Sequence, residues 1–238
     1  MNNLLSENFF GDLLEQLNST LLIQDRYLMY LEGLSNTIII SLGAVFLGVI
    51  LGIIFATIKY IYKLTGKLAV LERIVNFLIF IVRGTPVVLQ LMIMYFVILF
   101  FISNGILVSI ITFGINSGAY VAETFRGGLE SVDIGQYEAG RALGLDMRKT
   151  IFKIIIPQAI KTTIPAIFNE FIALVKETSV AGYIAIKDIT YAAYRIQSRT
   201  MDAFFPLIIS ALIYLVIVWM LTMALKMIER RLRAGDKK

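Results

Sequence analysis

The side chains best suited to chemistry lie within strongly apolar surroundings. Glu170 occurs in Asn169-Glu170-Phe171, near the middle of an apolar run. An ionisable group inside a membrane helix is costly, so this carboxylate must pair, protonate or face a water-filled cavity. In a cavity it could hold an ammonium group or a cationic side chain. The alternative is a structural ion pair or hydrogen bond with a neighbouring helix, and the residues alone leave both open.

A second group of polar residues repeats with helical spacing. Asn116, Tyr120 and Glu123 stand at i, i+4 and i+7, which places them on one stripe of a helix. Asn116 and Tyr120 lie nearer the middle of their apolar run and are candidates for lining a cavity. For Glu123 we expect an ion pair with Arg126, three residues further along. Hydrogen bonding between helices is the alternative role for this stripe.

The third candidate is a break in an apolar run at Arg83-Gly84-Thr85-Pro86. Pro86 has no N–H to donate, and it disfavours helix at the residue before it. Helix breaks at membrane depth are tolerated where they face protein or a cavity, and transporters use them to bind substrate. Freed backbone N–H groups suit a carboxylate, and Thr85 and Gln90 could assist. A plain kink is the alternative.

Several kinds of chemistry are excluded by composition. The chain has no histidine and no cysteine. Disulfides, thiolate nucleophiles, histidine metal ligands and Ser-His-Asp triads are therefore impossible. A Gly-x-x-x-x-Gly-Lys-Ser/Thr phosphate loop is also missing, so we expect no hydrolysis of ATP by this chain. We expect neither enzymatic activity nor a bound cofactor or metal.

The elements that position these residues are expected to be membrane helices. The chain is 58% hydrophobic, against about 45–50% for a soluble domain. Its apolar runs cover Thr37–Ile58, Leu68–Ile102, Ile106–Leu129, Gln158–Tyr183 and Phe204–Met227. Most are close to the roughly 20 residues that span a bilayer, and lipid permits only helices there. We therefore predict an all-α integral membrane protein with about five transmembrane helices.

The run at 68–102 is too long for one perpendicular crossing and too short for two. We predict a single crossing that is kinked or broken at residues 83–86, with its first half tilted or near the interface. The layout of this segment is the least defined part of the predicted fold.

Basic residues predict the orientation. They gather on the side that holds the loop after the first helix, the loop 130–157 and the C-terminus, and the positive-inside rule places this side in the cytoplasm. The N-terminus is then outside and the C-terminus inside. Residues 1–32 are expected to form an extracytoplasmic or interfacial amphipathic segment, because leucines 13, 14, 17 and 21 have helical spacing. The membrane domain spans 33–233, and 234–238 form a cytoplasmic tail.

The cytoplasmic segment 130–157 reads ESVDIGQYEAGRALGLDMRKTIFKIIIP. Asp133 is suited to cap the start of a short helix, Gly144 to end it, and Pro157 to begin the next. The small residues between Ala139 and Gly144 would let another backbone approach closely. A solvated loop without a partner is the alternative.

This segment resembles the EAA loop of ABC importer membrane subunits. That pattern is Glu-Ala-Ala, three residues, Gly, nine residues, Ile, one residue and Leu-Pro. Here it reads Glu138-Ala139-Gly140, then Gly144, Ile154 and Ile156-Pro157, with Gly140 and Ile156 departing from it. The stretches RGTPVVLQL, INSGAYVAETFRGGLESV, PQAIKTTIPAIFNEFIALVKETSV and ERRLR resemble polar amino acid permeases of ABC uptake systems. The resemblance covers about residues 33–233.

The resemblance implies a cytoplasmic coupling helix that sits in a groove of an ATPase subunit. The residues it assigns to coupling are Glu138, Ala139, Gly140, Arg141 and Gly144. It implies as partners an ATP-binding cassette ATPase dimer, a second or sister permease and an extracytoplasmic substrate-binding protein, with ATP and Mg²⁺ bound by the ATPase. The location is the cytoplasmic membrane of a prokaryote.

The resemblance also strengthens the substrate hypothesis, because permeases of this type that carry cationic amino acids have an acidic residue at the position of Glu170. We therefore expect transport of a polar, and specifically basic, amino acid by alternating access. The candidate substrate-binding residues are Glu170, Asn169, Asn116, Tyr120, Thr85 and Gln90. We expect Lys176 and Glu177 to pair across helices or to meet the headgroups.

Three other functions are alternatives to an ABC importer permease. A stand-alone secondary transporter or channel would use Glu123 and Glu170 as ion sites, but the odd helix count, the lack of an internal repeat and the EAA-like loop argue against it. An intramembrane enzyme is disfavoured because the sequence has no paired carboxylates at a suitable spacing. A structural membrane scaffold is the third alternative. We expect an outer loop from about Ile186 to Phe205, which could contact the substrate-binding protein.

Overall fold

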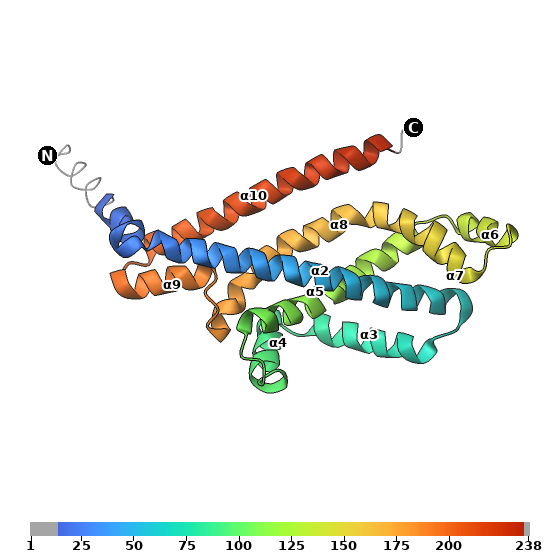
Figure 1. The fold of residues 1–238 in the computed structure, drawn as a ribbon, viewed down its shortest axis with the longest axis horizontal. Helices are drawn as coiled ribbons and strands as arrows, with labels where there is room; N and C mark the ends of the chain where they lie inside the picture. The colour runs from blue at the N-terminus through green and yellow to red at the C-terminus, as the bar shows by residue number, and fades with distance from the viewer. Residues whose placement is uncertain (1–13, 236–238) are drawn as a thin grey trace.

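The protein is a bundle of long helices in the computed structural model, which describes residues 14–235 (Figure 1). The expectation for 1–32 therefore lies partly outside the described residues. Four helical stretches are long and apolar enough to cross a membrane: Ile23–Thr65, Gly105–Glu130, Met147–Ile184 and Phe204–Leu232. The broken pair Ala69–Gly84 and Val87–Ile98 makes a fifth if it counts as one span. The predicted fold class is confirmed.

Two helices form the centre of the bundle. α2 (Tyr27–Thr65) packs along α5 (Gly105–Glu130). Gly48 and Gly52 of α2 face Ser117 and Val121 of α5, and a Cβ at Gly48 would lie 2.8 Å from the Ser117 Cβ. Small residues let two membrane helices approach closely, so this contact depends on the absence of side chains. α2 begins ten residues before the apolar run that predicted it.

The second predicted run is broken where expected. α3 (Ala69–Gly84) and α4 (Val87–Ile93), which continues as the π-helix η2 (Met94–Ile98), are bent by 109°. Thr85 and Pro86 between them have extended backbone angles, as the residue before a proline prefers. Figure 1 shows α3 running beside α2 while α4 turns away. The half that leaves the line of the bundle is therefore the second, and the expectation that the first half is tilted or near the interface stays a prediction.

The remaining helices complete two ends of the molecule. α8 (Ile156–Glu177) returns along α5, and the 3-10 helix η4 (Thr178–Ile184) extends it. α10 (Phe204–Gly235) packs on α8 and α9. The short helices α6 (Ile134–Ala142) and α7 (Met147–Thr150) lie at the end opposite to α9 (Figure 1). We call these the α6 end and the α9 end.

The expected outer loop is a helix, which corrects the prediction for 186–205. α9 (Ile189–Thr200) is capped by Asp188, whose carboxylate accepts hydrogen bonds from the backbone N–H groups of Thr190 and Tyr191. Its buried residues are Ile189, Ala192, Ala193 and Ile196. An N-cap aspartate followed by apolar residues at i, i+3, i+4 and i+7 is typical of an amphipathic helix, so the signal was present in the sequence.

Candidate functional site

Side chains of Gln90 and Thr85 bond to the backbone at the break between α3 and α4, where the Thr85 hydroxyl donates to the Ile81 oxygen at 2.9 Å. The Gln90 amide nitrogen donates to the backbone oxygens of Val82, at 2.7 Å, and Thr85, at 3.0 Å. It also lies 2.8 Å from the Thr85 hydroxyl oxygen. A helix break leaves carbonyl groups without helical partners, and lipid offers no replacement. Gln90 and Thr85 therefore supply hydrogen bonds that the break has removed.

The Gln90 side chain also links the break to α5 through a hydrogen bond. Asn116 is buried on α5, and its amide nitrogen donates to the Gln90 side-chain oxygen at 3.0 Å. The structure thus brings together three predicted substrate-binding residues, Thr85, Gln90 and Asn116. Their polar groups bond to one another and to the broken backbone. A structural role for all three follows directly from these contacts, and their contact with a substrate stays a prediction.

Tyr120 lies one turn further along α5 and has a different neighbour. Its ring is about two-fifths exposed, and the guanidinium carbon of Arg83 lies 5.1 Å from the ring centroid. A cation within about 6 Å of an aromatic face is attracted by the ring quadrupole. Arg83 was not among the predicted site residues. Its place in the last turn before the Gly-Thr-Pro break was the signal available for it.

Glu170 and Asn169 come from α8. Glu170 is half-buried and lies close to Ser117 of α5, whereas Asn169 is exposed. Within residues 14–235, Glu170 forms no ion pair. Lys176 and Glu177 form no ion pair there either, and their expected place at the headgroups stays a prediction.

A cavity of about 380 Å³ lies at the break, but it gathers only part of the predicted site. Thr85, Gln90 and Thr112 are its polar lining, and the other lining side chains are aliphatic or methionine. Asn116, Tyr120, Asn169 and Glu170 lie outside it. No group of His, Cys, Asp and Glu side chains among the described residues is arranged to hold a metal ion.

Near the α6 end, a chain of ion pairs joins α2 to α5. Lys59 lies 2.5 Å from one oxygen of Glu123, and Arg126 lies 3.0 Å from the other. Arg126 also pairs with Glu130 at 2.8 Å, which in turn pairs with Lys63. The expected pairing of Glu123 with Arg126 is confirmed. Lys59, which reaches Glu123 from another helix, was not predicted.

α6 is built as the sequence indicated. The Asp133 side chain accepts a hydrogen bond from the backbone N–H of Gly135 at 2.7 Å, which caps the start of the helix. Gly144 follows the end of the helix with a φ of +79°, a conformation that favours glycine. Glu138, Ala139 and Arg141 are exposed, and Leu143 is 81% exposed. An exposed apolar side chain among charges is suited to a protein contact.

Gly140 is the buried residue of α6 and seats it on the chain that follows. A Cβ at this position would lie 2.7 Å from the Thr150 Cγ2 and 3.0 Å from the Ile154 Cδ1. Either distance is shorter than normal packing allows. The departure from alanine in the EAA-like pattern thus has a steric cause, because α6 lies too close to Thr150 for a methyl group.

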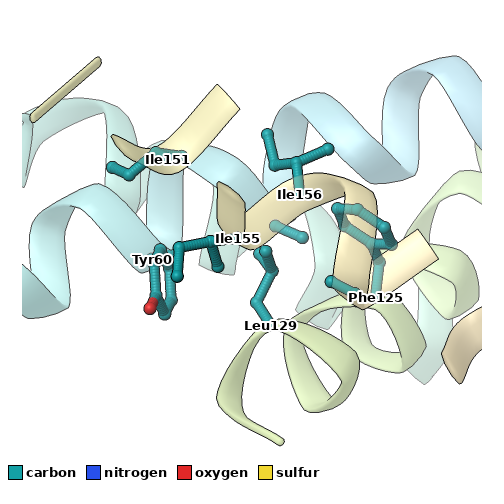
Figure 2. Close-up of a cluster of buried hydrophobic side chains, with 8 residues drawn as sticks. Tyr60, Phe125, Leu129, Ile151, Ile155 and Ile156 are labelled. Atoms are coloured by element: carbon teal, nitrogen blue, oxygen red, sulfur yellow. The ribbon is translucent and has the colours of Figure 1, made fainter. Parts of the chain in front are cut away.

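The residues beneath α6 lead into the core of the bundle. Ile151 and Ile155 of the π-helix η3 (Ile151–Ile155) are buried between helices. Figure 2 shows them with Ile156 beside Tyr60 of α2 and Phe125 and Leu129 of α5. Ala56 and Ala159 complete this cluster. A displacement of α6 would therefore reach three membrane helices through close-packed side chains.

Comparison with known proteins adds family relationships to this geometry. Residues 44–234 match the family described as binding-protein-dependent transport system inner membrane component. The arginine transport system permease protein ArtQ of Bacillus subtilis is 38% identical over 209 residues, covering 87% of this chain and 93% of ArtQ. The putative glutamine transport system permease protein GlnP of Rickettsia typhi is 35% identical over 210 residues, covering 87% and 94%.

Two solved structures have the same fold. A crystal structure of an amino acid ABC transporter with histidines matches with a TM-score of 0.78 and 34% identity, covering 88% of this chain and 96% of that one. The MetNI methionine ABC transporter, in an inward facing conformation, matches with a TM-score of 0.75 at 19% identity, covering 87% and 96%. The second likeness concerns the fold alone.

Proposed function

The chain belongs to the family of binding-protein-dependent transport system inner membrane components, and from this premise we propose that it carries a basic amino acid into the cell in an ATP-driven importer. It is the permease subunit of an amino acid ABC transporter, a multi-pass membrane protein and a transport component rather than an enzyme. Such permeases work with ATPase and substrate-binding protein partners.

The proposed mechanism rests on α6. Its exposed residues Glu138, Ala139 and Arg141 would enter a groove of the ATPase, while Gly140 keeps the helix seated against Thr150. Closure of two ATPase subunits on ATP and Mg²⁺ would then move α6, and the packed cluster beneath it would carry the motion into the membrane helices. Alternating access follows if two permease subunits, identical or sister, rock against each other.

A basic substrate is supported by Glu170. Its half-buried carboxylate has no ionic partner among the described residues, so a cationic side chain would complete it. The proposed setting is the cytoplasmic membrane of a prokaryote, with the α6 end and the C-terminus inside and the N-terminus outside. Basic residues at the α6 end support this orientation.

Transport by the assembled complex tests the proposal. The permease, its ATPase and its binding protein would be reconstituted in proteoliposomes, and uptake of labelled arginine, glutamine and cystine would be measured with and without ATP. We expect ATP-dependent uptake that prefers arginine and persists when an ionophore collapses the proton gradient. Glu170→Gln should reduce arginine uptake at least about tenfold with normal assembly.

Each outcome bears on a separate part of the proposal. Uptake that follows the proton gradient and ignores ATP would replace the importer with a secondary transporter. ATP-dependent uptake of glutamine or cystine in preference to arginine would retain the importer and reject the basic substrate.

A further inference from the structure

Arg83 is a cation that has no anionic partner among residues 14–235, and the length of α3 places it at membrane depth. It lies fourteen residues after the start of α3, which corresponds to about 21 Å along the helix axis, within a hydrocarbon core of about 30 Å. Its side chain is exposed, and it forms no hydrogen bond or ion pair with another described residue. A charged side chain at this depth is expensive and is expected to face a water-filled cavity and a ligand.

Tyr120 holds the guanidinium in place while leaving its hydrogen bonds unused. The Arg83 Cζ lies 5.1 Å from the centroid of the Tyr120 ring. Stacking on an aromatic face uses the plane of a guanidinium and leaves its edge of N–H donors free. A carboxylate is the anion that this edge binds best, since two parallel N–H···O bonds match its two oxygens.

Glu170, on α8, brings a negative charge to the same part of α5 as Arg83. Glu170 lies close to Ser117, which precedes Tyr120 by three residues. Residues three apart are neighbours on a helix surface, so the positions of α5 that Arg83 and Glu170 approach are adjacent. Asn116, in the same turn, is fixed by its bond to Gln90. A cation and an anion that approach adjacent positions of one helix match a molecule that carries both charges.

We propose that Arg83 binds the α-carboxylate of the transported amino acid, with Tyr120 positioning its guanidinium and Glu170 facing the substrate's positive group. This inference rests on the proposed function and adds to it the residue that recognises an amino acid as such. A phosphate of a lipid headgroup is the other oxyanion that a guanidinium could bind in a membrane, and the test separates the two.

The test uses the permease–ATPase complex without the binding protein, because the binding protein recognises the substrate independently. Equilibrium binding of labelled arginine would be compared with competition by agmatine, which is arginine without its carboxylate. Glutamine and 4-aminobutanamide form a second pair, so the result does not depend on a basic substrate. The variants are Arg83→Gln and, as a matched control, Arg73→Gln, which removes an exposed arginine from the same helix.

We expect Arg83→Gln to weaken binding of the amino acid at least about tenfold and to leave the decarboxylated analogue unchanged. Arg73→Gln should change neither. Tyr120→Leu should weaken amino acid binding, whereas Tyr120→Phe, which keeps the aromatic face, should retain most of the binding.

Three results would overturn the inference. Equal loss of the amino acid and its analogue would give Arg83 a structural role. Unchanged binding of both in Arg83→Gln would show that the guanidinium does not bind the substrate, and a lipid phosphate would be the remaining anion. An effect of Arg73→Gln as large as that of Arg83→Gln would show a general effect of charge. If the unchanged complex bound neither arginine nor glutamine, the proposed substrate class would fail before Arg83 was tested.

Discussion

The helix break and α6 are both short, polar interruptions between apolar helices, yet they use their polar residues in opposite ways. At the break, the side chains of Gln90, Thr85 and Asn116 bond inward to backbone and to each other. On α6, Glu138 and Arg141 are exposed, whereas Gly140 and Tyr137 face the rest of the chain. A break embedded in lipid must satisfy its own hydrogen bonds, whereas the exposed residues of α6 are free to meet the partner proposed for them.

This comparison separates stability from function. Changes at the break should lower the stability of the subunit, because its hydrogen bonds are internal. Changes on the outer face of α6 should leave stability alone and affect only coupled transport.

The largest effect on stability is expected from Gln90→Leu. It removes the amide that serves Val82, Thr85 and Asn116, and at about 1 kcal/mol for each lost bond the cost is about 3 kcal/mol. Thermal unfolding in detergent would measure it. Gln158→Leu is the control, since Gln158 is exposed and its side chain bonds, among the described residues, only to the Ile154 backbone of the adjoining η3. An equal loss in both variants would contradict the role given to Gln90.

The ion pairs between these two regions sharpen the comparison. Glu123→Gln leaves Lys59 and Arg126 without their shared carboxylate, and we expect a loss of about 2 kcal/mol. Lys59→Met leaves Glu123 paired with Arg126 and should cost less than about 1 kcal/mol. Unfolding at low and high salt would compare the two, and a larger loss for Lys59→Met would refute the network.

A smaller effect is expected where α6 is seated. Gly140→Ala places a methyl group against the Thr150 Cγ2, and the strain of about 1 kcal/mol should displace α6 and lower ATP-dependent uptake. Thr150→Ser removes that methyl group, so the double variant should regain much of the uptake. Uptake assays on both single variants and the double variant form the test, and the absence of any rescue would show that the contact is not the cause.

The smallest effect concerns the α9 end and pH. Burial raises the pKa of the Asp188 carboxyl above its ordinary value, so the folded state holds its proton more tightly than the unfolded state. Stability should therefore fall as pH rises from about 4 through the raised value, and then become constant. Asp188→Asn, which keeps one capping oxygen, should remove this dependence. Unfolding followed at a series of pH values would detect it, and an identical pH profile in the variant would disprove it.

The sequence predicted α6 better than the break for a physical reason. Asp133, Gly144 and Pro157 act on their own neighbours, so spacing along the chain was enough to place the helix. The bond between Gln90 and Asn116 joins residues 26 apart, and that between Lys59 and Glu123 joins residues 64 apart. The identity of such partners depends on how helices cross, which no local pattern specifies. The helical stretch before Thr37 and the helix α9 were readable in principle and were missed.

The central claim is that α6 couples the permease to its ATPase through outward-facing residues, and one charge reversal tests it most directly. ATP hydrolysis, arginine and glutamine uptake and thermal unfolding would be measured for Glu138→Arg and for Glu15→Arg, which reverses an exposed glutamate that precedes α2. The account predicts that Glu138→Arg abolishes ATP-dependent uptake with unchanged unfolding, while Glu15→Arg retains both. Normal ATP-dependent uptake in Glu138→Arg would contradict it.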